Sequence, residues 1–230
     1  MKTIGVLGGI GPQATMEFEA RIHREARNLI PPHRNSGYPP MVVSYFRALP
    51  MRLGPDGAPA VPLQVNPGLL EAARRLGTLA DFIVITSNFT HLFLREIEAA
   101  AGRPVLSMIA MTLDEVRRRG WRRVGVLGFG DPQVYTRPLT EEGRACETLD
   151  PAFRARLDQA IYALSEGRGD DASTACAREA VDALRARGVE GVILGCTEIP
   201  LLLRLPDLPP DLIDPAGLLA VAAVRHALQP

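Results

Sequence analysis

The chain has 230 residues, 47% of them hydrophobic and 23% charged, and its formal net charge at pH 7 is zero. This length accommodates one large domain or two small lobes with real cores. The charge balance gives no overall field that would favour nucleic acid or an anionic membrane surface. No apolar run approaches the roughly 20 residues of a membrane-spanning helix, and the chain opens on a strand pattern instead of a signal peptide. We therefore expect a soluble cytoplasmic protein.

The cysteines do not form a structural pattern. There are three, Cys146, Cys176 and Cys196, and no two are spaced as CxxC. An odd count without that spacing predicts neither a disulfide framework nor a zinc site. We expect no metal, and we interpret Cys146 and Cys176 as packing residues.

The first elements are a strand, a glycine loop and a helix. Thr3–Leu7 is strand-like, Gly8–Pro12 is a tight loop, and proline suits the first turn of a following helix. The loop matches neither GxGxxG nor a P-loop, and no lysine follows it, so a nucleotide site is disfavoured. We expect its backbone, at Gly9 and Gly11, to approach a small substrate whose carboxylate sits on N–H groups. The helix has one apolar stripe, formed by Ala14, Phe18, Ile22, Ala26 and Leu29.

Two further strands of the first half end in polar residues. After the strand 41–45, Arg47 or Arg52 offers a guanidinium that can bind a carboxylate in a bidentate manner, although most arginines are simply exposed. After the strand 82–86 comes Ser87-Asn88-Phe89-Thr90-His91. Asn88 suits an amino-acid ligand, but Asn88 or Thr90 is equally typical of a helix N-cap. We interpret His91 as structural, and as a possible partner of Ser87.

The second half repeats this plan. A strand at 123–128 ends in Gly128-Phe129-Gly130-Asp131, helices are predicted from 150 to 164 and from 172 to 187, and a strand Val192–Leu194 runs into Gly195-Cys196-Thr197-Glu198. A thiol at a strand tip, beside the first turn of a helix, would have its thiolate favoured by the helix dipole. The alternative is that Cys196 is a small buried hydrophobe.

Strands and helices alternate along the whole chain. This pattern predicts an α/β fold of two similar lobes, each a parallel sheet flanked by helices with right-handed crossovers. Ligands of such sheets bind at the carboxyl ends of the strands, so we expect the active site in a cleft between the lobes. We place residues 1–115 and 209–230 in the first lobe and residues 116–208 in the second.

Three segments resemble the signatures of the aspartate/glutamate racemase family. They are GVLGGIGPQAT at 5–15, SNFTH at 87–91 and ILGCTEIPLL at 193–202. The glutamate after Cys-Thr is similar to the aspartate racemase branch. The family's first motif normally begins with cysteine, whereas this chain has Ser87, and the loop at 128–131 departs from the threonine-containing loop usual in the family.

The resemblance implies the roles of the site residues. It implies two proton-transfer groups, Cys196 and Ser87, no cofactor and a homodimer. A pyridoxal cofactor is also disfavoured because Lys2 is the single lysine. The implied substrate-binding residues are Gly9, Gly11, Arg47, Asn88, Phe89, Thr90, Thr197 and Glu198.

Three functions remain open at this point. The first is a cofactor-independent racemase of aspartate, glutamate or a related amino acid, which removes and returns the Cα proton. The second is a single-cysteine enzyme on the same scaffold, such as a decarboxylase resembling the arylmalonate decarboxylases or an isomerase of a small carboxylate. The third is a non-catalytic binder of small carboxylates. Fold alone does not choose among them.

Overall fold

The computed structural model of the protein describes residues 1–31 and 37–229. The chain divides into two compact units, of which the first contains Met1–Ser107 with Leu219–Pro230 and the second contains Met108–Leu218. Each unit contains a four-stranded parallel sheet, which confirms the predicted fold class.

The sheet of the first unit has the strand order β2-β1-β3-β4, with all neighbours parallel. Its central strands are the apolar runs that the sequence predicted, as expected for a sheet that is covered on both faces. The elements are β1 (Ile4–Gly8), α1 (Pro12–Leu29), β2 (Met41–Tyr45), α2 (Pro67–Gly77), β3 (Phe82–Ile85), the 3₁₀ helix η1 (Phe89–Phe93), α3 (Leu94–Ala101) and β4 (Val105–Leu106).

The sheet of the second unit has the order β6-β5-β7-β8 and is likewise parallel. In both units the first strand pairs with the second and third, and the fourth strand pairs with the third. The elements are α4 (Met108–Arg119), β5 (Arg123–Leu127), α5 (Gln133–Glu141), β6 (Ala145–Glu147), α6 (Pro151–Ser165), α7 (Asp171–Arg185), β7 (Gly191–Leu194), α8 (Ile199–Leu203), β8 (Leu212–Ile213) and α9 (Pro215–Leu228), whose last part belongs to the first unit.

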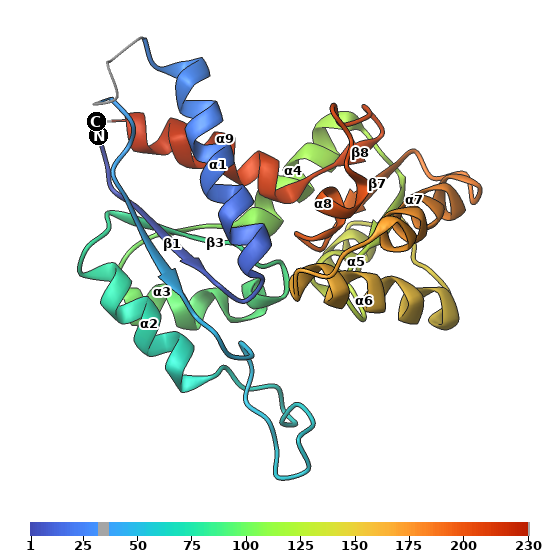
Figure 1. Ribbon diagram of the computed structural model, residues 1–230, viewed down its shortest axis with the longest axis horizontal. Helices are drawn as coiled ribbons and strands as arrows, with labels where there is room; N and C mark the ends of the chain where they lie inside the picture. Colours follow the sequence, from blue (N-terminus) through green and yellow to red (C-terminus); the bar gives the residue numbers. More distant parts are fainter. Residues whose placement is uncertain (32–36, 230) are drawn as a thin grey trace. The chain divides into compact units, whose positions relative to one another are not determined.

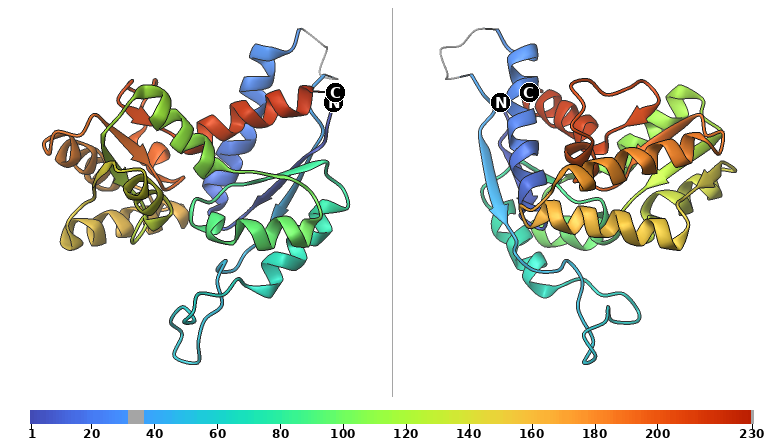
Figure 2. Two further views of the ribbon diagram at one scale, coloured as in Figure 1. Left: turned by 180° about the vertical axis from the view of Figure 1, so that it is seen from behind. Right: turned by 45° about the vertical axis from the view of Figure 1, so that its right-hand side comes forward.

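Helices cover both faces of the first sheet. Helices α2 and α3 lie on one face, and α1 and the end of α9 lie on the other (Figures 1 and 2). On the α2–α3 face, Leu7, Ile83 and Ile85 of the strands pack with Leu76 and Ile97 of the helices. On α1 the predicted stripe is buried at Ala14, Phe18, Ile22 and Ala26, but Leu29 is exposed because it is the last residue of the helix.

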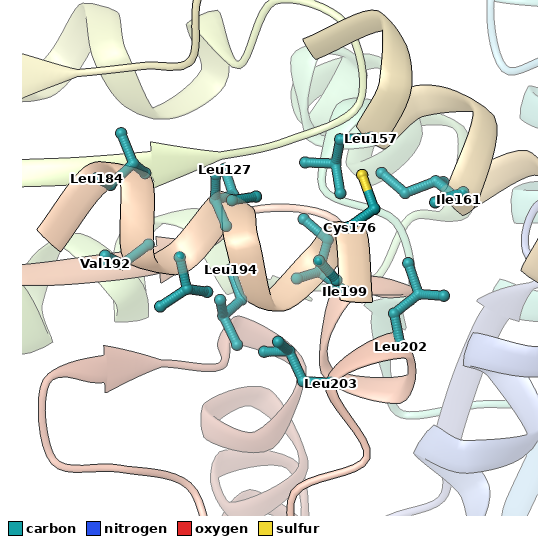
Figure 3. Packing of buried hydrophobic residues seen from close by; sticks show 14 of the residues in the cluster. Leu127, Leu157, Ile161, Cys176, Leu184, Val192, Leu194, Ile199, Leu202 and Leu203 are labelled. Atoms are coloured by element: carbon teal, nitrogen blue, oxygen red, sulfur yellow. The ribbon is translucent and has the colours of Figure 1, made fainter. Parts of the chain in front are cut away.

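Alternate residues of the second sheet pack into two different clusters. Val192 and Leu194 of β7 face α6, α7 and α8, where they meet Leu157 and Leu184 (Figure 3). Ile193 faces the other way, into a cluster with residues of α4 and α5. This alternation is the period of two of a β-strand, and it buries the strand that precedes Cys196 on both sides.

Strand β8 belongs to the second sheet. The sequence analysis placed residues 209–230 with the first lobe, whereas Leu212 and Ile213 pair with Val192 and Ile193. The residues that return to the first unit begin at Leu219. The prediction differs from the structure because β8 has only two residues, and so short a strand leaves no pattern in the sequence. In the described part of the chain, no helix is long and apolar enough to cross a membrane.

His91 has a structural role at the start of η1. Its Nδ1 lies 2.8 Å from the main-chain oxygen of Ser87. A carbonyl oxygen only accepts, so Nδ1 carries the proton, and this nitrogen cannot act as a base toward the Ser87 hydroxyl. Burial lowers the pKa of His91 to about 4, so the imidazole is neutral near pH 7.

The buried neutral imidazole makes stability depend on pH. Between pH 6.5 and 4 the unfolded chain binds a proton at His91 that the folded chain does not, so stability falls as the pH is lowered through this window. From pH 7 to pH 5 the contribution is about 2 kcal/mol. Urea unfolding at both pH values should show a smaller loss for His91→Asn, which keeps an N–H near the Nδ1 position. An equal loss in both proteins would contradict this assignment.

Gly77 allows α2 to approach α3 closely. A Cβ atom at this position would lie 2.0 Å from the main-chain oxygen of Ala101. We expect Gly77→Ala to lower the free energy of unfolding by about 1–3 kcal/mol, the usual cost of overpacking, as measured by urea unfolding. Gly68→Ala in the same helix is the matched control, because its Cβ would come no closer than 3.2 Å to another atom. Equal effects of the two substitutions would exclude the steric explanation.

Candidate active site

The third strand of the second sheet carries Cys196 at its carboxyl end. The Gly195 amide donates to the Leu127 carbonyl over 2.7 Å, which continues the pairing of β7 with β5 by one residue. A Cβ at Gly195 would lie 2.6 Å from that carbonyl oxygen, so only glycine allows this approach. The chain then leaves the sheet, and Cys196, Thr197 and Glu198 form the turn into α8.

These three residues form one hydrogen-bonded group. The Cys196 thiol donates to Oε2 of Glu198 over 3.0 Å, and the Thr197 hydroxyl donates to the same oxygen, also over 3.0 Å. Glu198 is 5% exposed, whereas Cys196 and Thr197 are half-buried. A buried carboxylate thus lies in direct contact with the thiol, a position from which it can exchange a proton with sulfur.

The thiol of Cys196 is protonated in the resting protein. Burial raises its pKa well above the usual value, and the negative charge of Glu198 raises it further. The sequence analysis expected the helix dipole to favour the thiolate, and this expectation is wrong. The helix that follows has only five residues, and the main-chain hydrogen bond from Glu198 to the sulfur is outweighed by burial and by the carboxylate.

A second carboxylate, Asp158, acts on the same thiol. It lies on α6, accepts a hydrogen bond from the Gly130 amide over 3.0 Å, and contributes to the raised pKa of Cys196. Burial also raises the pKa of Asp158 itself. Because Gly130 belongs to the loop after β5, this bond ties the tip of the neighbouring strand to α6.

The third strand of the first sheet carries Ser87 at its end, the place equivalent to that of Cys196 in the other sheet. Ser87 Oγ accepts from the Thr90 hydroxyl over 2.9 Å and from the Thr90 amide over 3.4 Å. Ser87 therefore performs the capping that was expected of Asn88 or Thr90, since the Asn88 side chain makes no capping bond. With both bonds received from Thr90, the Ser87 hydroxyl retains its own proton for donation.

Of the other residues on this tip, Asn88 and Thr90 are buried and Phe89 is exposed. Phe89 as a whole residue is 36% exposed, and its ring contacts the Phe93 ring edge to face, with centroids 6.3 Å apart. The end of β3 therefore carries the Ser87 hydroxyl and the Phe89 ring, and the buried Thr90 holds the Ser87 hydroxyl by a hydrogen bond.

The glycine loop after β1 is held from within by Thr15. The Gly9 amide donates to Thr15 Oγ1 over 2.9 Å, and this hydroxyl also lies 3.0 Å from Thr86 Oγ1 and 2.9 Å from the Gly11 carbonyl. The Gly9 amide was expected to bind a substrate carboxylate, but it donates its hydrogen bond to the Thr15 side chain. Gly9 has φ +84°, and a Cβ there would lie 2.6 Å from Cα of Tyr45, so the loop depends on glycine.

Arg47 joins this loop to the end of β2. Its guanidinium donates to the Gly9 carbonyl over 3.2 Å, and the side chain is otherwise exposed. Arg52 instead contacts the Gln64 side chain over 3.3 Å, on the long loop before α2. Arg47 is therefore the better placed of the two to hold a carboxylate beside the glycine loop.

The structure thus brings the predicted residues together in three groups. Cys196, Thr197 and Glu198 form the first group, Ser87 and Thr90 form the second, and Gly9 and Arg47 form the third. The sequence analysis did not identify Thr15 or Asp158. Thr15 lies inside the first signature segment and was visible there. Asp158 had no such signal, because it reaches the thiol only through the packing of α6.

A match to a family model identifies the family of this chain. The model of the Asp/Glu/Hydantoin racemase family matches residues 7–223. The broad specificity amino-acid racemase RacX of Bacillus subtilis is 23% identical over 229 residues, which cover 98% of each chain. A stretch of 104 residues, 44% of the chain, is 33% identical to an uncharacterised protein of Pectobacterium carotovorum and covers 68% of it.

Solved structures show the same fold. An aspartate racemase homologue from Pyrococcus horikoshii superposes with a TM-score of 0.75 at 24% identity, covering 100% of both chains. The aspartate racemase of Picrophilus torridus gives a TM-score of 0.77 at 19% identity, covering 99% of this chain and 94% of the other. From the family match over residues 7–223, we conclude that this chain belongs to the Asp/Glu/hydantoin racemase family.

Proposed function

We propose that the protein is a cofactor-independent amino-acid racemase in which Cys196 and Ser87 are the proton-transfer groups. The observation that carries this proposal is the 3.0 Å hydrogen bond from the Cys196 thiol to buried Glu198, at the end of the third strand. Membership of the racemase family supports it, as does the broad-specificity racemase among the curated relatives. The homodimer expected from the resemblance stays a prediction.

Racemisation removes the Cα proton from one face and returns a proton to the other, so it needs one group at each face. In our proposal the resting Cys196 thiol is the acid, and it becomes a base only after its proton has passed to Glu198. The electron pair left on Cα is delocalised into the substrate carboxylate, and a guanidinium such as that of Arg47 stabilises the charge that develops there. Thr197 holds the Glu198 carboxylate in place through its hydroxyl.

Ser87 is the weaker of the two groups. A serine hydroxyl needs an adjacent base to remove a proton, and Nδ1 of His91 is bound to a carbonyl. Its free proton makes Ser87 a proton donor or a relay through water. We therefore expect exchange to be slower in one direction than in the other. The same asymmetry favours, as the second candidate, a single-cysteine enzyme that protonates a carbanion after loss of carbon dioxide.

The raised pKa of the thiol leads to a test of the Cys196–Glu198 pair. Glu198→Gln removes the negative charge but keeps an acceptor, so the pKa of Cys196 should fall toward its usual value. The pH dependence of alkylation by iodoacetamide, followed by mass spectrometry of the peptide containing Cys196, measures this shift. Glu141→Gln, an exposed change of the same charge, serves as the control. An unchanged or higher alkylation midpoint in Glu198→Gln would exclude the proposed coupling.

Deuterium uptake at Cα tests the function itself. Both enantiomers of a panel of amino acids are incubated in heavy water, and uptake and optical rotation are followed. Cys196→Ala should lower uptake by at least about 100-fold, the usual contribution of a general acid or base. Ser87→Cys should raise it, because a thiol with a pKa of about 8.5 is a far better base than a hydroxyl. Glu198→Gln should lower uptake even though it lowers the thiol pKa.

Cys146→Ser and Cys176→Ala are the matched controls, since neither thiol belongs to the site, and both should exchange like the unmodified protein. Uptake by Cys196→Ala at the unmodified rate would refute the role of Cys196. If no amino acid exchanges, the racemase proposal fails, and release of carbon dioxide from arylmalonates tests the second candidate.

A further inference from the structure

Two aromatic rings are exposed at the end of β5. Phe129, in the loop after this strand, and Tyr162, on α6, contact each other edge to face, with centroids 4.8 Å apart and an interplanar angle of 82°. Their exposed fractions are 42% and 52%. The pair therefore presents apolar ring surface to solvent, and burying such surface against a ligand is favourable.

These rings lie close to the thiol within the second unit. Phe129 follows the tip of β5 as Cys196 follows the tip of β7, and the two strands are paired neighbours. Gly130 donates to Asp158, which acts on the Cys196 thiol and lies one helical turn before Tyr162. The aromatic pair therefore lies on the two elements that adjoin the tip carrying Cys196, the loop after β5 and helix α6.

The charges near the thiol are negative. Glu198 and Asp158 both raise the pKa of Cys196 through their negative charges, and the charge of Arg154 lowers the pKa of Asp158. A substrate with a second carboxylate beside the aromatic pair would meet the like charge of Asp158 in a partly buried place, which is unfavourable. Binding of an acidic substrate side chain would therefore require a cation of the protein at this place.

Arg154 does not provide that cation. Its Nε is buried without a hydrogen-bond partner among residues 1–31 and 37–229, and a terminal nitrogen lies 3.5 Å from the Leu149 carbonyl. The hollow that it lines with Gly128, Gly130 and Thr148 has room for about one water molecule. A substrate carboxylate is too large to reach this guanidinium through the hollow.

The tip of the first sheet independently carries an aromatic ring. Phe89 lies two residues after Ser87 and is exposed. Arg47, which is held at the glycine loop, offers one guanidinium, enough for the α-carboxylate that every amino acid has. Exposed aromatic residues therefore occur at the strand end that carries Ser87 and at the end of β5, the strand paired with the one before Cys196.

We propose, resting on the racemase function above, that the substrate is an amino acid with a neutral apolar side chain, aromatic or long aliphatic. Phe129 and Tyr162 determine this specificity by packing against that side chain. Aspartate and glutamate are poor substrates because Asp158, which lies on the same helix as Tyr162, repels their second carboxylate.

The test measures deuterium uptake at Cα as kcat/KM for phenylalanine, leucine, methionine, aspartate, glutamate and lysine. The first three should exceed aspartate and glutamate by at least about 10-fold, the lower range for discrimination by an apolar pocket. Phe129→Ala and Tyr162→Ala should reduce this ratio, mainly by raising KM for the apolar substrates. Leu208→Ala, which removes a side chain of similar exposure (43%) before the amino end of β8, should leave the ratio unchanged.

Asp158→Asn removes a negative charge while keeping an acceptor for the Gly130 amide. It should raise uptake with aspartate and glutamate relative to phenylalanine. A preference of the unmodified protein for aspartate, glutamate or lysine would overturn the specificity inference and leave the racemase function standing. If none of the six amino acids takes up deuterium, the proposed racemase function is refuted, and the specificity inference that rests on it is refuted as well.

Discussion

The close pairing of β7 with β5 is the constraint on which the second unit depends. Gly195 continues that pairing past the last residue of the strand, at a distance that no side chain would permit, because its amide must reach the Leu127 carbonyl. The chain is thereby forced to turn at Cys196. The thiol therefore lies at the end of the sheet, and Glu198, the residue before α8, contacts it through its carboxylate. A buried strand, a glycine and a short helix are sufficient to place a thiol against a carboxylate.

Much of the fold could be predicted because its signals are local. The apolar runs at 82–85 and 192–194 became central strands, and Asp150 caps α6 by accepting from the Phe153 amide, near the predicted start of that helix. Strand β8 has two residues and pairs with a strand some twenty residues away, so no periodicity revealed it. Because β8 pairs with β7, residues 209–218 belong to the second unit, whereas the sequence analysis placed them in the first lobe.

The sequence indicated that Cys196, Thr197 and Glu198 belong together, but it did not indicate the electrostatics around the thiol. The resemblance identified Cys196, Thr197 and Glu198, yet three consecutive letters do not tell whether the carboxylate faces the thiol or solvent. Helix dipole and carboxylate act on the thiol in opposite directions, and only the geometry decides which is stronger. Thr15 lies in a signature segment, but its contact with Thr86, 71 positions along the chain, has no local signature, and neither does the action of Asp158 on Cys196.

A thiol that is protonated at rest changes the order of events expected at this site. A thiolate would be ready to remove a Cα proton at once, whereas in the proposed mechanism the Cys196 thiol first transfers its proton to Glu198. This transfer is short, since the two groups are already hydrogen-bonded, and it moves the negative charge from the carboxylate to sulfur. Arrival of a substrate ammonium group would favour that shift, because a nearby positive charge stabilises the thiolate. The carboxylate that suppresses the thiolate in the free protein is thus also the group that allows it to form when substrate binds. We expect such an arrangement to keep the sulfur less reactive toward oxidants and alkylating agents until a substrate is present.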